Sequence, residues 1–203
     1  MPKSQYKKNT PYFLLALLFA FLVVAAPVFT GEKFSISKEI LEASEEKYGR
    51  DARLRLISWE NVILEDTSAT DREKIEKVNH FFNQLEFVSD SVHWGENDYW
   101  ATPIEFLGSG GGDCEDFSLS KYFTLLAMGI SEKKLNLTYV KALKLNQHHM
   151  VLTYFSMPDE EPLVLDNLTD LVLPASQRMD LLPIYSFNGI GLWLSKQRGQ
   201  GRL

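Results

Sequence analysis

The feature that constrains this chain most is a glycine-rich tract that runs directly into a helix. Ser109 and three glycines are followed by Asp113, a residue type that caps helix N-termini, and then by Cys114. Apolar residues recur at mostly helical spacing until Gly129. The pattern predicts a helix from Cys114 to about Met128, which places the cysteine at the unpaired N–H groups of a helix start.

The rest of the chain predicts helices before this point and strands after it. Helical patterns cover 52–64 and 70–85, an irregular segment covers 89–112, and strand patterns cover 135–145, 150–155 and 163–166. A group of helices followed by an antiparallel sheet is typical of the α+β class. We therefore expect N-terminal helices packed on an antiparallel β-sheet.

The first thirty residues have the pattern of an export signal. Three lysines lie within the first eight residues, and an uncharged apolar run extends from Tyr12 to about Phe29. Because Pro27 makes a poor cleavage site, a cleaved signal peptide and a retained membrane anchor both remain open. The predicted organisation is a signal peptide or anchor at 1–30, a polar lead-in segment at 31–50 and the main domain at 51–203.

The acidic balance of the chain argues against nucleic acid as a partner. The net charge of −6 becomes −9 without 1–30, because that segment holds three lysines and no acid. Nucleic-acid binding needs a basic surface that neutralises phosphates, and no basic stripe follows Lys8. The acidic excess favours a cation or a cationic partner.

Cys114 is the one cysteine of the chain, so it cannot form an internal disulfide. A thiol becomes nucleophilic when it is deprotonated, and a helix N-terminus lowers its pKa by favouring the anion. The small residues before it let a substrate carbonyl approach the sulfur, and the backbone N–H of Cys114 is a candidate oxyanion donor. We interpret Cys114 as an activated nucleophile.

The acids next to Cys114 work against a thiolate. Asp113, Glu115 and Asp116 raise the pKa of a neighbouring thiol unless their charge is neutralised. Acids in a first turn also complement the helix dipole, and for Asp116 that interpretation is equally good. A bound Ca²⁺, which takes carboxylate and carbonyl oxygens, would offset the charge of Asp113 and Glu115, and Asp98 is a further acid of the preceding loop.

A nucleophile of this kind needs a base and a group that orients the base. If the strands on either side of Met157 and Pro158 form a symmetric hairpin, residues whose numbers sum to 315 face each other, and His149 and Asp166 satisfy that sum. Directly opposed residues are close enough for a carboxylate to hold an imidazole N–H. His148 points to the opposite face of any strand and is the alternative base.

Four segments carry a resemblance to a known family: Tyr99-Trp100-Ala101-Thr102-Pro103 before Glu105-Phe106, Gly112-Asp113-Cys114-Glu115-Asp116-Phe117-Ser118, His149-Met150-Val151-Leu152, and Val164-Leu165-Asp166-Asn167-Leu168. They resemble the bacterial transglutaminase-like cysteine proteinases of the transglutaminase/papain-like superfamily, and within these the LapG-type periplasmic proteases. The resemblance runs from about Trp59 to Trp193.

The resemblance implies a transglutaminase/papain-like cysteine protease fold for 51–203. It implies a catalytic triad of Cys114, His149 and Asp166, and Ca²⁺ ligands at Asp113, Glu115 and Asp98. It further implies a calcium-dependent periplasmic endopeptidase that cuts the N-terminal region of a large cell-surface adhesin at a paired-alanine site and releases cells from a biofilm. An inner-membrane receptor that responds to cyclic-di-GMP is implied as the inhibitory partner.

Two other functions fit the same residues. The triad could transfer an acyl group from a glutamine side chain to an amine, as a transglutaminase does. Alternatively, the domain could be a non-catalytic interaction module in which calcium orders a loop. Proteolysis shortens a substrate, acyl transfer leaves its length unchanged, and a binding module does not depend on Cys114.

Overall fold

The computed structural model describes residues 33–65 and 68–194, so the predicted signal peptide or anchor at 1–30 lies outside the described residues. Within these two ranges no helix is both long and apolar enough to cross a membrane. The compact unit that contains the predicted main domain begins at Lys33. It therefore includes most of the segment predicted as a polar lead-in, in which residues 38–48 form a helix.

Three helices open the described chain: α1 (Lys38–Tyr48), α2 (Arg50–Leu64) and α3 (Asp71–Phe82). The helices predicted over 52–64 and 70–85 correspond to α2 and α3. Thr70 caps α3 through a reciprocal capping box with Glu73, so the helix begins where the sequence predicts. The helix ends earlier than predicted because Asn83 takes the C-cap position.

The predicted irregular segment contains more structure than its glycines suggest. Strand β1 (Glu86–Phe87) lies just before it, and the segment itself holds α4 (Asp90–His93), α5 (Pro103–Ser109) and β2 (Gly111–Gly112). Helix α5 forms because Thr102 and Glu105 make a capping box and Pro103 supplies the first helical residue. The predicted helix from Cys114 follows as α6 (Cys114–Ala127), with Asp113 at its N-cap.

The second half of the chain forms a six-stranded antiparallel sheet in the order β6-β5-β4-β3-β7-β8. Its strands are β3 (Leu135–Ala142), β4 (Gln147–Tyr154), β5 (Leu163–Asp166), β6 (Thr169–Pro174), β7 (Leu181–Phe187) and β8 (Leu192–Leu194). Short 3-10 helices η1 (Glu132–Lys134) and η2 (Ala175–Gln177) precede β3 and follow β6. The α+β prediction is confirmed, and the sequence patterns missed β6, β7 and β8.

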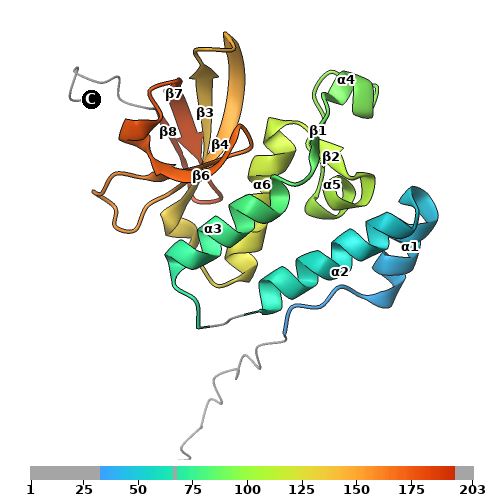
Figure 1. The fold of residues 1–203 in the computed structure, drawn as a ribbon. Coiled ribbons are helices and arrows are strands. Elements are labelled where there is room, and N and C mark those ends of the chain that lie inside the picture. The colour runs from blue at the N-terminus through green and yellow to red at the C-terminus, as the bar shows by residue number, and fades with distance from the viewer. Residues whose placement is uncertain (1–32, 66–67, 195–203) are drawn as a thin grey trace, which may run out of the picture. The chain divides into compact units, whose positions relative to one another are not determined.

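Helices α3 and α6 lie between the sheet and the helices α1 and α2 (Figure 1). Strand alternation places buried residues on both faces of β4 and β5. Met150, Leu152 and Leu165 belong to the main core that the helices cover, whereas Val151 and Val164 belong to a smaller cluster on the other face. Helix α6 packs against β3, β4 and β5, so the sheet positions the helix that carries Cys114.

The pairing of β4 with β5 differs from the predicted hairpin. Leu152 pairs with Leu165 and Thr153 with Val164, so paired numbers sum to 317 rather than 315. The cause is the turn, in which the Glu160 N–H donates to the Met157 carbonyl, one residue beyond the predicted centre. A change of two in the sum keeps each side chain on its face, so the two predicted partners, His149 and Asp166, become diagonal rather than direct neighbours.

Candidate active site

The glycines before Cys114 are required by close backbone packing. Strand β2 pairs in parallel with β1, and a Cβ on Gly111 would lie 2.5 Å from the Glu86 carbonyl oxygen. A Cβ on Gly112 would collide with the Asp116 carboxylate. Asp116 in turn accepts from the Asp113 N–H at 3.4 Å, which closes the capping box of α6. The tract therefore fixes where α6 begins and where the thiol lies.

Cys114 is buried at this helix start, and its surroundings favour the neutral thiol. Its Sγ lies 2.8 Å from Glu115 Oε2 and donates to that carboxylate. Burial raises the pKa of the Cys114 thiol, the negative charge of Glu115 raises it further, and a backbone hydrogen bond from Met150 opposes them. The conflict predicted from the acidic neighbours is therefore present in the structure. The Met150 contact also places the sulfur beside β4, one residue from His149.

A group of three carboxylates lies at the start of α6. Asp90, Asp113 and Asp116 each offer an oxygen within 4.8 Å of the others, and Asp113 forms a second such group with Cys114 and Glu115. Burial and the nearby acids raise the pKa of Asp113 to about 8, and burial raises the pKa of Asp116 to about 6. The raised pKa values mean that the protein's own groups do not offset the cost of ionising these buried carboxylates.

The donor set fits a hard cation. Asp90 is 4 % exposed, its Oδ2 accepts from the Tyr99 N–H at 2.6 Å, and its Oδ1 has no hydrogen-bond partner among the described residues. A buried carboxylate oxygen without a partner beside other carboxylates is suited to an oxygen-preferring ion such as Ca²⁺. Of the ligands that the resemblance implies, Asp113 belongs to both groups and Glu115 to the group with Cys114, and Asp90 and Asp116 are further candidates.

Asp98, the third implied ligand, belongs to neither carboxylate group in the described chain. Its side chain is exposed, and its Oδ1 accepts a hydrogen bond from Trp100 Nε1 at 2.9 Å. The sequence missed Asp90 because it lies more than twenty residues before Cys114, across two short elements. Asp116 was visible as a first-turn acid, but spacing did not separate a dipole partner from a ligand.

His149 and Asp166 form a buried pair at adjacent strands. The Nε2 atom of His149 lies 2.7 Å from Asp166 Oδ1, and both side chains are almost fully buried. Asp166 Oδ1 also accepts from the Leu168 N–H at 3.0 Å, and Oδ2 accepts from Arg178 Nη2 at 2.6 Å. Burial acts to raise the pKa of Asp166, but the hydrogen bond and charge of His149, with Leu168 and Arg178, lower it to about 2. Asp166 is an ionised partner that fixes the imidazole.

The alternative base, His148, has no carboxylate partner among the residues that the structure describes. Its ring is exposed and stacks on Tyr139, with centroids 5.2 Å apart and planes at 13°. Tyr139 stacks in turn on Tyr185. The structure therefore brings Asp166 to His149 and leaves His148 in an aromatic row with Tyr139 and Tyr185.

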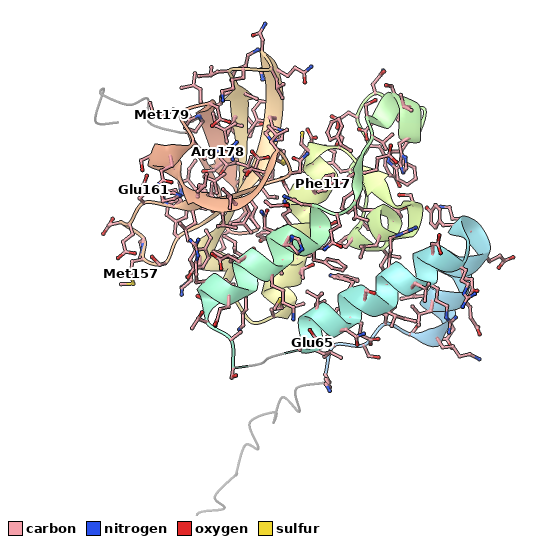
Figure 2. All side chains as sticks on the ribbon, in the orientation of Figure 1. Glu65, Phe117, Met157, Glu161, Arg178 and Met179 are labelled. Atoms are coloured by element: carbon pink, nitrogen blue, oxygen red, sulfur yellow. The ribbon has the colours of Figure 1, made fainter. Side chains whose placement is uncertain are left out.

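Arg178 was missed by the sequence reasoning. It follows η2 and lies among the strands of the sheet (Figure 2), where it pairs with Asp180 at 2.9 Å as well as with Asp166. A lone arginine twelve residues beyond Asp166 carries no spacing signal, since its place depends on the path of β6 and η2. No motif in the sequence could have identified it.

One known family matches the chain in sequence. The sequence model of the family described as bacterial transglutaminase-like cysteine proteinase matches residues 58–181. A comparison with curated proteins gives no match.

Solved structures of LapG from Legionella pneumophila are similar to the chain. One is 45% identical over 80% of this chain and 90% of that chain, with a TM-score of 0.70. An EGTA-treated form is 45% identical over 81% and 89% with a TM-score of 0.71, and a calcium-bound form is 46% identical over 83% and 93% with a TM-score of 0.70. The chain has the transglutaminase-like fold, and it belongs to the bacterial transglutaminase-like cysteine proteinases.

Proposed function

We propose that the protein is a calcium-dependent cysteine endopeptidase whose catalytic triad is Cys114, His149 and Asp166. The observation that carries the proposal is the buried His149–Asp166 pair on β4 and β5, one residue from the Met150 backbone that contacts the Cys114 sulfur. Family membership supports peptide hydrolysis over other uses of the same residues.

In the proposed reaction each residue has one task. Asp166 holds Nε2 of His149, so Nδ1 is the ring nitrogen that takes the Cys114 proton and returns it to the leaving amine. The thiolate attacks the peptide carbonyl, and the N–H of Cys114, unpaired within the helix, donates to the developing oxyanion. Water then hydrolyses the thioester and regenerates the thiol.

The calcium dependence rests on the carboxylates at the start of α6. Asp90, Asp113, Asp116 and Glu115 are the residues that would hold the ion, and its charge would offset theirs beside the thiol. Without that compensation Glu115 holds the thiol proton and the pKa of Cys114 stays raised. The relative solved in calcium-bound and EGTA-treated forms supports this part of the proposal.

The cellular role follows from the resemblance and the N-terminal pattern. We place the protein in the periplasm, with residues 1–30 acting as a signal peptide or as a tether to the inner membrane. Its substrate is the N-terminal region of a large surface adhesin, cut at paired alanines so that cells leave a biofilm. An inner-membrane receptor for cyclic-di-GMP is the inhibitor.

Incubation with a purified adhesin N-terminal fragment tests the proposal. Two shorter products that require Cys114 and Ca²⁺ are expected. A fragment of unchanged length that incorporates an added amine would instead identify an acyl transferase. An intact fragment that binds the protein equally well after Cys114→Ala would identify a non-catalytic module.

A further inference from the structure

Lys121 is a fully buried lysine of α6 that the proposed reaction does not use. Its side chain is 1 % exposed, and its Nζ donates to Asn79 Oδ1 at 2.8 Å and to Asn83 Oδ1 at 2.7 Å. The two asparagines lie four residues apart, at the end of α3. A lysine is almost never buried to this extent unless its polar end is fully paired.

The two amides link Lys121 to the turn between β5 and β6 through hydrogen bonds. Asn79 Nδ2 donates to the carbonyls of Thr169 and Asp170, at 3.3 and 3.1 Å. Asn83 Nδ2 donates to the carbonyls of Asp166 and Thr169, at 2.9 and 3.0 Å. Because Nζ of Lys121 donates to both amide oxygens, each amide is held with its oxygen toward Lys121 and its NH₂ toward the turn.

The network connects the helix that carries Cys114 with the turn that carries Asp166. Lys121 lies on α6, the helix that begins with Cys114, and the turn begins with Asp166. The carboxylate of Asp166 is held by His149 and Arg178, whereas its backbone carbonyl is held by Asn83. Asp166 is therefore held through its carboxylate by β4 and by the residue after η2, and through its carbonyl by the end of α3.

We propose that Lys121 is a positioning residue, which acts through Asn83 and Asn79 to fix Asp166 against His149. The inference rests on the proposed function, in which Asp166 orients the catalytic imidazole. In this role Lys121 neither touches the substrate nor exchanges protons. Burial lowers the pKa of Lys121 to about 7, although the negative charges of Asp166 and Asp170 act to raise it. Lys121 therefore acts on its neighbours through its hydrogen bonds rather than through a fixed charge.

The test compares full-length protein carrying Lys121→Met or Asn83→Ala with the wild type, at equal Ca²⁺ concentration. Methionine keeps an unbranched side chain of similar length but cannot donate, and the alanine change removes the link to the Asp166 carbonyl. Lys134→Met is the matched control, since Lys134 binds Asp71 at the other end of α3, at 2.7 Å. The direct readout is NMR of ¹⁵N-histidine-labelled protein, with His149→Gln used to assign the His149 Nε2–H signal.

In the wild type and in Lys134→Met, His149 should show a protected, low-field Nε2–H proton that is hydrogen-bonded to Asp166. In Lys121→Met and in Asn83→Ala this signal should broaden or disappear. The kcat for a paired-alanine peptide should fall about 10- to 100-fold, with KM changed much less, as expected for misplaced catalytic groups.

A wild-type His149 signal and wild-type kcat in either folded variant would overturn the inference. If Lys121→Met does not fold, Asn83→Ala decides alone. A wild-type protein that cleaves no peptide would refute the proposed function, whereas the NMR comparison would still decide whether Lys121 positions Asp166.

Discussion

Calcium binding at pH 7 should release about one proton from the protein. Asp113, with a pKa of about 8, is about nine-tenths protonated at that pH, and Asp116, with a pKa of about 6, is about one-tenth protonated. A bound cation requires both carboxylates in ionised form, so these protons must leave. The apparent affinity for Ca²⁺ should therefore rise about tenfold for each pH unit between about 6 and 8.

The same pKa values give the sign of the stability effect. Both carboxylates have folded pKa values above the unfolded value of 3.8, so the cation-free protein loses stability as pH rises from about 4 to about 8. Calcium removes this loss because it stabilises the ionised carboxylates. Ca²⁺ at about 100 times its Kd should add about 2.7 kcal/mol to the free energy of unfolding.

Isothermal titration calorimetry at pH 7, in buffers of different ionisation enthalpy, measures the number of protons released. The wild type and Asp51→Asn, which changes an exposed acid on α2, should release about one proton. Asp113→Asn should release almost none and should bind Ca²⁺ more weakly. A wild type that releases no proton, with a Kd that is constant from pH 6 to 8, would refute the reasoning about these carboxylates.

Three further outcomes follow from the His149–Asp166 pair. His149→Ala should abolish peptide cleavage while His148→Ala leaves kcat/KM of the same order, and steady-state kinetics showing the reverse would assign the base to His148. Asp166→Asn should lower kcat on the order of 10⁴-fold, as in other triads that lose the acid, and a loss below tenfold would show that Asp166 is not required. The depressed pKa of Asp166 contributes stability above pH 4 that is lost as pH falls toward 2. Between these pH values the free energy of unfolding, measured in urea, should therefore fall by about 2 kcal/mol more in the wild type than in Asp166→Asn. Equal losses in the two proteins would contradict that assignment.

The position of Cys114 could be predicted because its determinants are local. Asp113 caps the next helix through its own side chain, and the glycines before it are needed for contacts within the same short region. Local hydrogen bonding and backbone sterics therefore fix this part of the site. The acidic conflict at the thiol was also predictable, since it depends on adjacent residues.

The partners of Asp166 show where local reasoning ends. Alternation predicted the correct face for His149 and Asp166 although the hairpin register was wrong, because a change of two in the sum preserves side-chain parity. Arg178 and the Lys121 network reach Asp166 from η2, α3 and α6, whose places depend on tertiary packing. Strand β7 contains Pro183 beside a register shift against β3, and a proline within an apolar run weakens any strand prediction.

Asp90 was out of reach for the same reason. It begins a four-residue helix, and only the folding of the segment up to Ala101 brings its carboxylate to Asp113 and Asp116. The resemblance supplied Asp113 and Glu115 by motif, but the described carboxylate groups do not include Asp98.

The most direct test of the central claim is mass spectrometry of the products formed from a purified adhesin N-terminal fragment. Wild-type protein and Cys114→Ala would be compared with Ca²⁺, with excess chelator, and with Mg²⁺ added in place of Ca²⁺. We expect one cut between or beside paired alanines by the wild type with Ca²⁺, and an intact fragment in every other sample. Full cleavage in excess chelator would contradict the calcium site, and cleavage by Cys114→Ala would contradict the nucleophile.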